Sequence, residues 1–146
     1  MAARFLGILF IFFSHFAVAE GLEFNQGWSR AMVPGAQSAA IYGRFENKGG
    51  KDLSVQEITS EVAGMLMIHR SVLENGMMRM HHVGNLLVHP GETVVFEPGG
   101  LHIMLSGLKK ELVEGDSFEI KIGTTDGEYL EVKIIVGSIG QMSVPK

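Results

Sequence analysis

A β-hairpin is predicted by residues 62–83, which read VAGMLMIHRSVLENGMMRMHHV. Two runs rich in Val, Ile, Leu and Met, at 62–73 and 77–83, flank the sequence Glu74-Asn75-Gly76. Asn-Gly between two extended runs is the strongest short-range signal for a β-hairpin. The segment therefore favours an antiparallel β-structure.

The rest of the chain has the same short-strand pattern. Nineteen glycines fall between short runs of Val, Ile, Phe, Leu and Met, and no stretch has the periodicity of a long amphipathic helix. Besides the hairpin, the expected strands are Leu22–Arg30, Ala39–Asn47, Asp52–Ile58, Leu86–His89, Thr93–Phe96, Leu101–Leu105, Phe118–Ile122 and Tyr129–Val136. This spacing of short strands predicts a single all-β domain, either a sandwich or a barrel.

A signal peptide is predicted at residues 1–19. An apolar run at 5–13 is followed by the small-x-small sequence Ala17-Val18-Ala19, directly before Glu20. Segments of this kind direct export and are then removed. The alternative is an uncleaved membrane anchor, which is disfavoured because the apolar run is short for a bilayer and Ser14-His15 interrupts it.

The predicted mature domain, residues 20–146, is mildly acidic and lacks cysteine. The chain has a net charge of −4, which becomes −5 when Arg4 leaves with the signal peptide. This charge disfavours nucleic-acid binding, and the absence of cysteine argues against disulfides, a thiolate metal site and a lipoprotein anchor. No other stretch is suited to anchor the mature chain in a membrane. We expect the core alone to hold the domain together, with residues 140–146 as a loose tail.

Soft donor side chains cluster between residues 65 and 104, in a chain with nine methionines and six histidines. Side chains two apart on a strand share a face, so His102 and Met104 lie side by side while Ile103 points into the core. In the hairpin, His69 and Met80 share a face whenever the loop has an even number of residues.

The sequence leaves the register of the hairpin open. An Asn75-Gly76 loop places His69 opposite His82 with Met80 diagonally beside it, whereas a Glu74-Asn75 loop places His69 opposite Met80. A three-residue loop would turn Met80 to the other face. With either even loop, the hairpin and the later strand together offer four donors, namely His69, Met80, His102 and Met104.

Two imidazoles and two thioethers favour Cu(I). Thioether sulfur is soft and uncharged, and it binds Cu(I) well but Zn, Mg and Ca poorly. A blue-copper electron carrier needs a cysteine thiolate, which this chain lacks. Four protein ligands leave no open position for a substrate, and we find no nucleophile–base pair and no phosphate-binding glycine loop, so we expect a binding protein and no enzyme.

The spacing of these four residues resembles the signature of the periplasmic PCuAC copper chaperones. Ten residues separate His69 from Met80, twenty-one separate Met80 from His102, and one separates His102 from Met104. Other matching stretches are Trp28-Ser29-Arg30-Ala31 with Pro34-Gly35, Ala39-Ala40-Ile41-Tyr42 with Asn47, and Gly99-Gly100-Leu101-His102-Ile103-Met104-Leu105 with Gly107-Leu108. The resemblance covers nearly all of the mature chain.

The resemblance implies a cupredoxin-like or immunoglobulin-like antiparallel β-sandwich, closed as a barrel, that binds Cu(I) near its surface. It also implies a periplasmic monomer that delivers copper toward the CuA centre of cytochrome c oxidase. The implied partners are the apo CuA domain of oxidase subunit II and Sco-type thiol proteins. The chain departs from the family at His81-His82, where an Arg-Pro-like pair is more usual, and in a tail whose one soft donor is Met142. The first departure offers a further ligand, and the second argues against a Cu(II) site in the tail.

The neighbouring soft side chains have simpler interpretations. His81 and His82 are interpreted as exposed imidazoles, with His82 the better candidate ligand because it shares a face with Met80, and His89 is interpreted as a turn residue. A partly buried apolar face, or alternatively an adaptable docking rim, is formed by Met65, Met67, Met77 and Met78. Two alternative functions stay open, a copper buffer without a dedicated client and an interaction domain whose Met and His are structural.

Overall fold

A computed structural model describes residues 21–146, and within this range the chain forms ten β-strands and no helix. The strands are β1 (Leu22–Arg30), β2 (Ser38–Asn47), β3 (Leu53–Thr59), β4 (Ala63–Glu74), β5 (Met77–His82), β6 (Leu86–Val88), β7 (Thr93–Phe96), β8 (Leu101–Leu108), β9 (Ser117–Thr124) and β10 (Tyr129–Gly137). The predicted all-β fold is confirmed, and each of the ten strands corresponds to one of the expected ranges. The signal peptide predicted at 1–19 lies outside the described residues. Within them, no helix long and apolar enough to cross a membrane is found.

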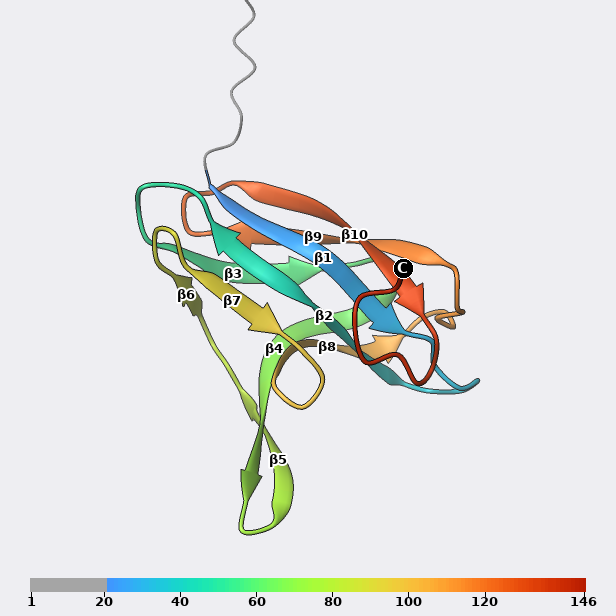
Figure 1. The fold of residues 1–146 in the computed structure, drawn as a ribbon. Helices are drawn as coiled ribbons and strands as arrows, with labels where there is room; N and C mark the ends of the chain where they lie inside the picture. Colours follow the sequence, from blue (N-terminus) through green and yellow to red (C-terminus); the bar gives the residue numbers. More distant parts are fainter. Residues whose placement is uncertain (1–20) are drawn as a thin grey trace, which may run out of the picture.

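A single sheet folds over on itself to form the two layers of a sandwich (Figure 1). Its hydrogen-bonded order is β5-β4-β8-β2-β1-β10-β9-β3-β6, and β7 also pairs with β2. Because β5 and β6 are free edges of this sheet, the fold is an open sandwich, and the closed barrel implied by the resemblance is not formed. Neighbouring strands are antiparallel except for β1 and β10, which run parallel. That parallel pair was not expected from the sequence.

The core lies between the two layers. It consists of side chains at alternate strand positions, which point inward. Three phenylalanine rings pack together, with the Phe45 centroid 4.6 Å from that of Phe24 and 5.3 Å from that of Phe96. Burial of each large apolar side chain contributes about 1.5–3 kcal/mol. Ile103 of β8 is completely buried, as predicted, so its neighbours on β8 face the other side of the sheet.

The hairpin of β4 and β5 projects from the body of the sandwich (Figure 1). Its turn is Asn75-Gly76, with φ angles of 50° and 78°, and Glu74 pairs with Met77. Positive φ at both central residues is the geometry of the tight turn that matches strand twist. The first of the two even-loop registers is therefore the one formed. Every residue of β5 is exposed, so the hairpin holds its outer strand away from the core.

Strand β1 contains an irregularity before Trp28. The pairing of β1 with β2 shifts between Asn25 and Trp28, and Gln26 has a φ of 54°. A bulge of this kind bends the strand and redirects its side chains. Beyond the bulge, the ring of Trp28 lies 4.8 Å from that of Tyr42, centroid to centroid. The Arg30 guanidinium carbon lies 5.8 Å from the Tyr42 ring centroid.

The C-terminal segment after β10 is irregular but contacts β1. Arg30 donates a hydrogen bond from Nε to the Gln141 carbonyl, at 2.6 Å, and a second from its guanidinium to the Met142 sulfur, at 2.9 Å. A Cβ atom on Gly137 would lie 2.9 Å from Pro145. The tail expected at 140–146 thus has no strand or helix, as its composition indicates, yet it packs against the end of the sandwich.

Candidate metal site

Two rows of donor side chains cross β4 and β8 on the face of the sheet opposite Ile103. His69 lies directly opposite His102, and Met67 lies directly opposite Met104. The imidazole centroids of His69 and His102 are 6.0 Å apart. Directly paired residues have Cβ atoms about 4.5–5.5 Å apart, within side-chain reach. The sheet therefore brings three of the four predicted ligands, one from β4 and two from β8, into neighbouring positions.

The His102 ring is held in one orientation by its own strand. Its Nδ1 lies 3.1 Å from the Gly100 carbonyl oxygen. A carbonyl only accepts, so Nδ1 carries the hydrogen in this contact and the lone pair is left on Nε2. Histidine ligands of metals are commonly oriented by such a hydrogen bond from the second ring nitrogen. His102 is 5% exposed, which further limits its motion.

Met80 reaches the same place from the hairpin. On β5 it pairs with Ser71, two positions along from the His69–His82 pair, so it lies diagonally beside His69 as the Asn75-Gly76 register predicts. A cavity of about 210 Å³ is lined by Met80, His102 and Met104 together with Arg30, Met32, Ser38, Ala39, Ala40 and Tyr42. The structure therefore brings Met80 to the cavity of the two β8 donors, although β4 separates β5 from β8.

His69 has an unsatisfied ring nitrogen. Its Nδ1 is buried and makes no hydrogen bond, a situation that costs about 1–3 kcal/mol for a polar group. Burial, and then the charges of His102 and His82, lower the pKa of His69 from its usual 6.5. The neutral imidazole, which is the metal-binding form, is thus favoured at neutral pH. A metal ion at this face would satisfy the orphaned nitrogen, so the residues present fit a bound metal.

Methionine sulfur is needed to complete a shell of four protein donors. Among residues 21–146, no three His, Asp or Glu side chains converge in an arrangement that could hold a metal. An ion held here by four protein donors would therefore take thioethers beside the imidazoles, which soft ions accept and Zn, Mg and Ca bind poorly.

Several residues around the cavity were not predicted as part of it. Arg30 and Tyr42 line it. The Trp28 ring packs against that of Tyr42. The pairing of β1 with β2 beyond a bulge determines these positions, and a local sequence pattern carries little information about it.

The interpretation of the neighbouring methionines as a partly buried face is wrong for most of them. Three are largely solvent-exposed, namely Met65, Met77 and Met78 at 54%, 57% and 59%. Met67 alone is half-buried. For Met77 and Met78 the physical reason is the projection of the hairpin, which leaves β5 exposed along its whole length.

Among the described residues, His81 and His89 lie away from the cavity, whereas His82 lies directly opposite His69. His81 is on the opposite face of the hairpin, where its Nε2 is 2.9 Å from a Glu74 carboxylate oxygen. His89 is a turn residue, as predicted, since its carbonyl accepts from the Glu92 amide, and its Nδ1 is 2.9 Å from Asp52. His81 and His82 are both exposed, as expected.

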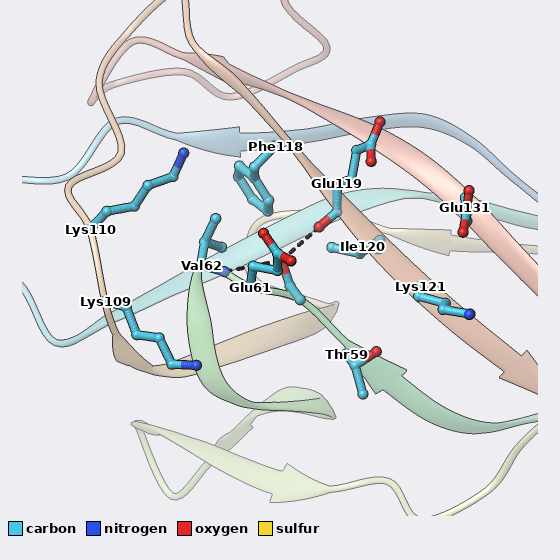
Figure 2. A pocket seen from close by; sticks show the side chains of 11 residues that line it. Thr59, Glu61, Val62, Lys109, Lys110, Phe118, Glu119, Ile120, Lys121 and Glu131 are labelled. Carbon is cyan, nitrogen blue, oxygen red and sulfur yellow. Dashed lines mark hydrogen bonds between the residues drawn. The ribbon is translucent and has the colours of Figure 1, made fainter.

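A larger cavity of about 620 Å³ lies at another edge of the sandwich (Figure 2). Three lysines and three glutamates surround it, namely Lys109, Lys110, Lys121, Glu61, Glu119 and Glu131. Ser60 donates a hydrogen bond to the Glu119 carbonyl across it. Its charges are mixed and its lining contains no His or Met, so it offers no soft-metal chemistry.

A family model described as "Putative lipoprotein LpqE-like" matches residues 22–136. The chain belongs to this LpqE-like family. Its resemblance to PCuAC domains is confirmed by the same match and by solved structures that are similar to it. A protein of Leifsonia xyli subsp. xyli (strain CTCB07), also named as a putative lipoprotein, is 31% identical over 119 residues, or 81% of this chain and 70% of that protein. An uncharacterised protein of Rickettsia prowazekii (strain Madrid E) is 28% identical over 121 residues, or 80% and 67%.

Two solved structures place this LpqE-like chain among PCuAC folds. The Cu(I)-bound solution structure of a Deinococcus radiodurans protein is 27% identical, covers 83% of each chain and has a TM-score of 0.64. The copper-bound PCuAC domain of PmoF2 is 17% identical, covers 81% of this chain and 93% of its own, and has a TM-score of 0.69. The latter likeness shows the fold alone.

Proposed function

We propose that this chain is an exported, non-catalytic protein that binds one Cu(I) as cargo with His69, Met80, His102 and Met104, and passes it to another protein. One observation carries the proposal. Met80, His102 and Met104 line a single small cavity, and His69 lies against His102 with a buried, unpaired ring nitrogen. Two thioethers beside two neutral imidazoles make a donor set for Cu(I).

The comparisons support copper as the metal. The Deinococcus radiodurans relative was solved with Cu(I), and the PmoF2 domain with copper. The absence of cysteine from this chain removes the thiolate on which most other soft-metal sites depend. Neutral donors suit a carrier, because they bind an ion without the strong electrostatic attraction that would oppose its release.

The difference in exposure between two of the donors suggests how the ion leaves. His102 is 5% exposed and Met80 is 61% exposed. A bound ion would thus be covered by the sandwich on one side and by the methionine of a projecting hairpin on the other. A donor from a client protein would approach past Met80 and replace its thioether while His102 still holds the ion.

We assign the apo CuA domain of cytochrome c oxidase subunit II, or a Sco-type thiol protein, as the client, and the periplasm as the compartment. Export is supported by the lipoprotein description of the family and of the Leifsonia relative. The protein would act there as a monomer.

Transfer to the client tests this proposal. The Cu(I)-loaded protein is mixed anaerobically with an apo CuA domain, the two are separated, and copper is measured in each. We expect the ion to move to the CuA domain, and we expect a strain lacking this protein to lose oxidase activity when copper is limiting and to recover it with added copper. Copper that stays on this chain, together with normal oxidase activity and sensitivity to excess copper in the deletion strain, would identify a copper buffer without a dedicated client.

A further inference from the structure

A third imidazole continues the row formed by His69 and His102. His82 of β5 lies directly opposite His69 on the side away from His102. The ring centroids of His69 and His82 are 5.8 Å apart, and the rings are nearly perpendicular, at 80°. Three strands thus present His82, His69 and His102 in one line across the face, and the four donors proposed for Cu(I) leave the first of these unused.

The spacing of the His69–His82 pair fits one shared metal ion. An imidazole nitrogen binds such an ion at about 2.0–2.1 Å, which puts the ion about 3.2 Å from each ring centroid and separates two bound rings by about 5–6.5 Å. The observed 5.8 Å falls within this range. The pair therefore needs no change of strand register to close on an ion.

All three rings cannot share that ion. His82 and His102 lie on the two strands that flank β4, so they approach His69 from opposite sides. This agrees with the finding that no three His, Asp or Glu side chains in residues 21–146 converge on one point. His69 can therefore pair with His102 or with His82, but one ion cannot use both.

We propose that His69 and His82 form a second coordination site, which takes Cu(II) and excludes occupation of the Cu(I) site because both use His69. The His69–His82 pair offers nitrogen alone, which Cu(II) prefers, and Cu(II) is the strongest binder among the divalent first-row ions. His82 is exposed, so water fills the remaining positions around the ion. The mutual exclusion rests on the proposed Cu(I) function, whereas binding of Cu(II) to the pair does not.

The adjacent histidine provides a matched control. His81 points to the other face of the hairpin and contacts Glu74, so His81→Ala removes an exposed imidazole of the same strand without touching the pair. His82 is exposed, and His82→Ala leaves the core intact.

The test is titration of the untagged apo protein with Cu(II) in air, in competition with glycine, combined with electron paramagnetic resonance of the bound ion. We expect His82→Ala to weaken Cu(II) binding at least tenfold and to reduce the nitrogen coupling by one imidazole, while Cu(I) affinity measured anaerobically stays within about twofold. His81→Ala should change neither. Preloading with Cu(I) should block Cu(II) uptake at this site.

Other results would overturn the inference. Unchanged Cu(II) affinity in His82→Ala would show that the pair is not the site, and an equal loss of Cu(I) and Cu(II) affinity would place His82 within a single shared site. Met80→Leu separates this question from the proposed function, because it should weaken Cu(I) binding and leave Cu(II) binding unchanged. If His82→Ala fails to weaken Cu(II) binding while Met80→Leu weakens Cu(I) binding, the second site is refuted. If Met80→Leu fails to weaken Cu(I) binding while His82→Ala weakens Cu(II) binding, the proposed Cu(I) ligands are refuted.

Discussion

Methionine sulfur is the donor that distinguishes this site from a zinc site, so its removal is the most informative change at a single residue. Met104→Leu and Met80→Leu keep nearly the same volume, and such replacements usually cost less than about 1.5 kcal/mol of stability. We expect Cu(I) affinity to fall at least about tenfold in each, equivalent to about 1.4 kcal/mol, in anaerobic competition with a chelator. Met77→Leu is the control, since Met77 is 57% exposed on the same hairpin but on the opposite face. Equal affinities in all three variants would contradict the ligand roles.

The pKa values of two histidines should depart from the ordinary value in opposite directions. Burial lowers the pKa of His69, whereas the hydrogen bond with Asp52 raises the pKa of His89. In an NMR titration of the apo protein, the midpoint for His69 should therefore lie below pH 6.5 and the midpoint for His89 above it. Because folding favours neutral His69, its contribution to stability is lost as pH falls through 6.5 toward its folded pKa. Because folding favours charged His89, its contribution is lost as pH rises through its folded pKa. The reverse order of titration would show that burial does not control His69.

Strand parity was enough to predict which residues share a face. His102 and Met104 lie together and Ile103 is buried, as the two-residue period requires. Parity does not say whether a face is covered, and for this reason the exposure of Met65 was not foreseen. Nor does it show that Tyr42 lies near Met104, since a different strand pair places it there.

At the scale of one element, the hairpin turn can be tested by replacing its glycine. Gly76 has a φ of 78° and no atom within 4 Å of the Cβ that Gly76→Ala would add. The cost is therefore conformational, and we expect a loss of about 1–2 kcal/mol in urea denaturation, with faster amide exchange in β4 and β5. Gly84→Ala is the control, since its added Cβ also meets no atom and its φ is not positive. A larger loss in the control would contradict this account of the turn.

The hairpin shows how far a local pattern determines an element. Asn75-Gly76 identified the turn, and the two even loops predicted that Met80 and His69 share a face. The choice between these loops required the actual turn geometry, with positive φ at both residues. The parallel pairing of β1 with β10 joins residues more than a hundred positions apart, and no local pattern predicts such a pair.

At the scale of the whole molecule, stability should depend on the core alone, because the chain has no cysteine for a disulfide. Phe45 is completely buried and contacts two other phenylalanine rings. We expect Phe45→Ala to lower the free energy of unfolding by about 3–5 kcal/mol, measured by urea denaturation. Val95→Ala, at a position 48% exposed, should change it by less than about 0.5 kcal/mol. A similar small effect in both would show that the core is not the main source of stability.

The sequence pattern predicted the all-β class of the fold, but it did not predict that the sheet stays open. Short strands punctuated by glycine indicated an all-β sandwich or barrel, and the open sandwich is one of these. The resemblance implied the barrel, but the path from β5 to β6 leaves both edges unpaired. Closure depends on how far the sheet twists and folds over, a property of many strands together.

The central claim is that one Cu(I) is held by two imidazoles and two thioethers. Copper K-edge X-ray absorption of the anaerobically loaded protein tests it most directly, because nitrogen and sulfur neighbours scatter differently. We predict two nitrogen ligands at about 2.0 Å and two sulfur ligands at about 2.3 Å, with one sulfur lost in Met80→Leu and one in Met104→Leu. A copper shell with nitrogen and oxygen alone, or a sulfur count that neither substitution changes, would contradict the account.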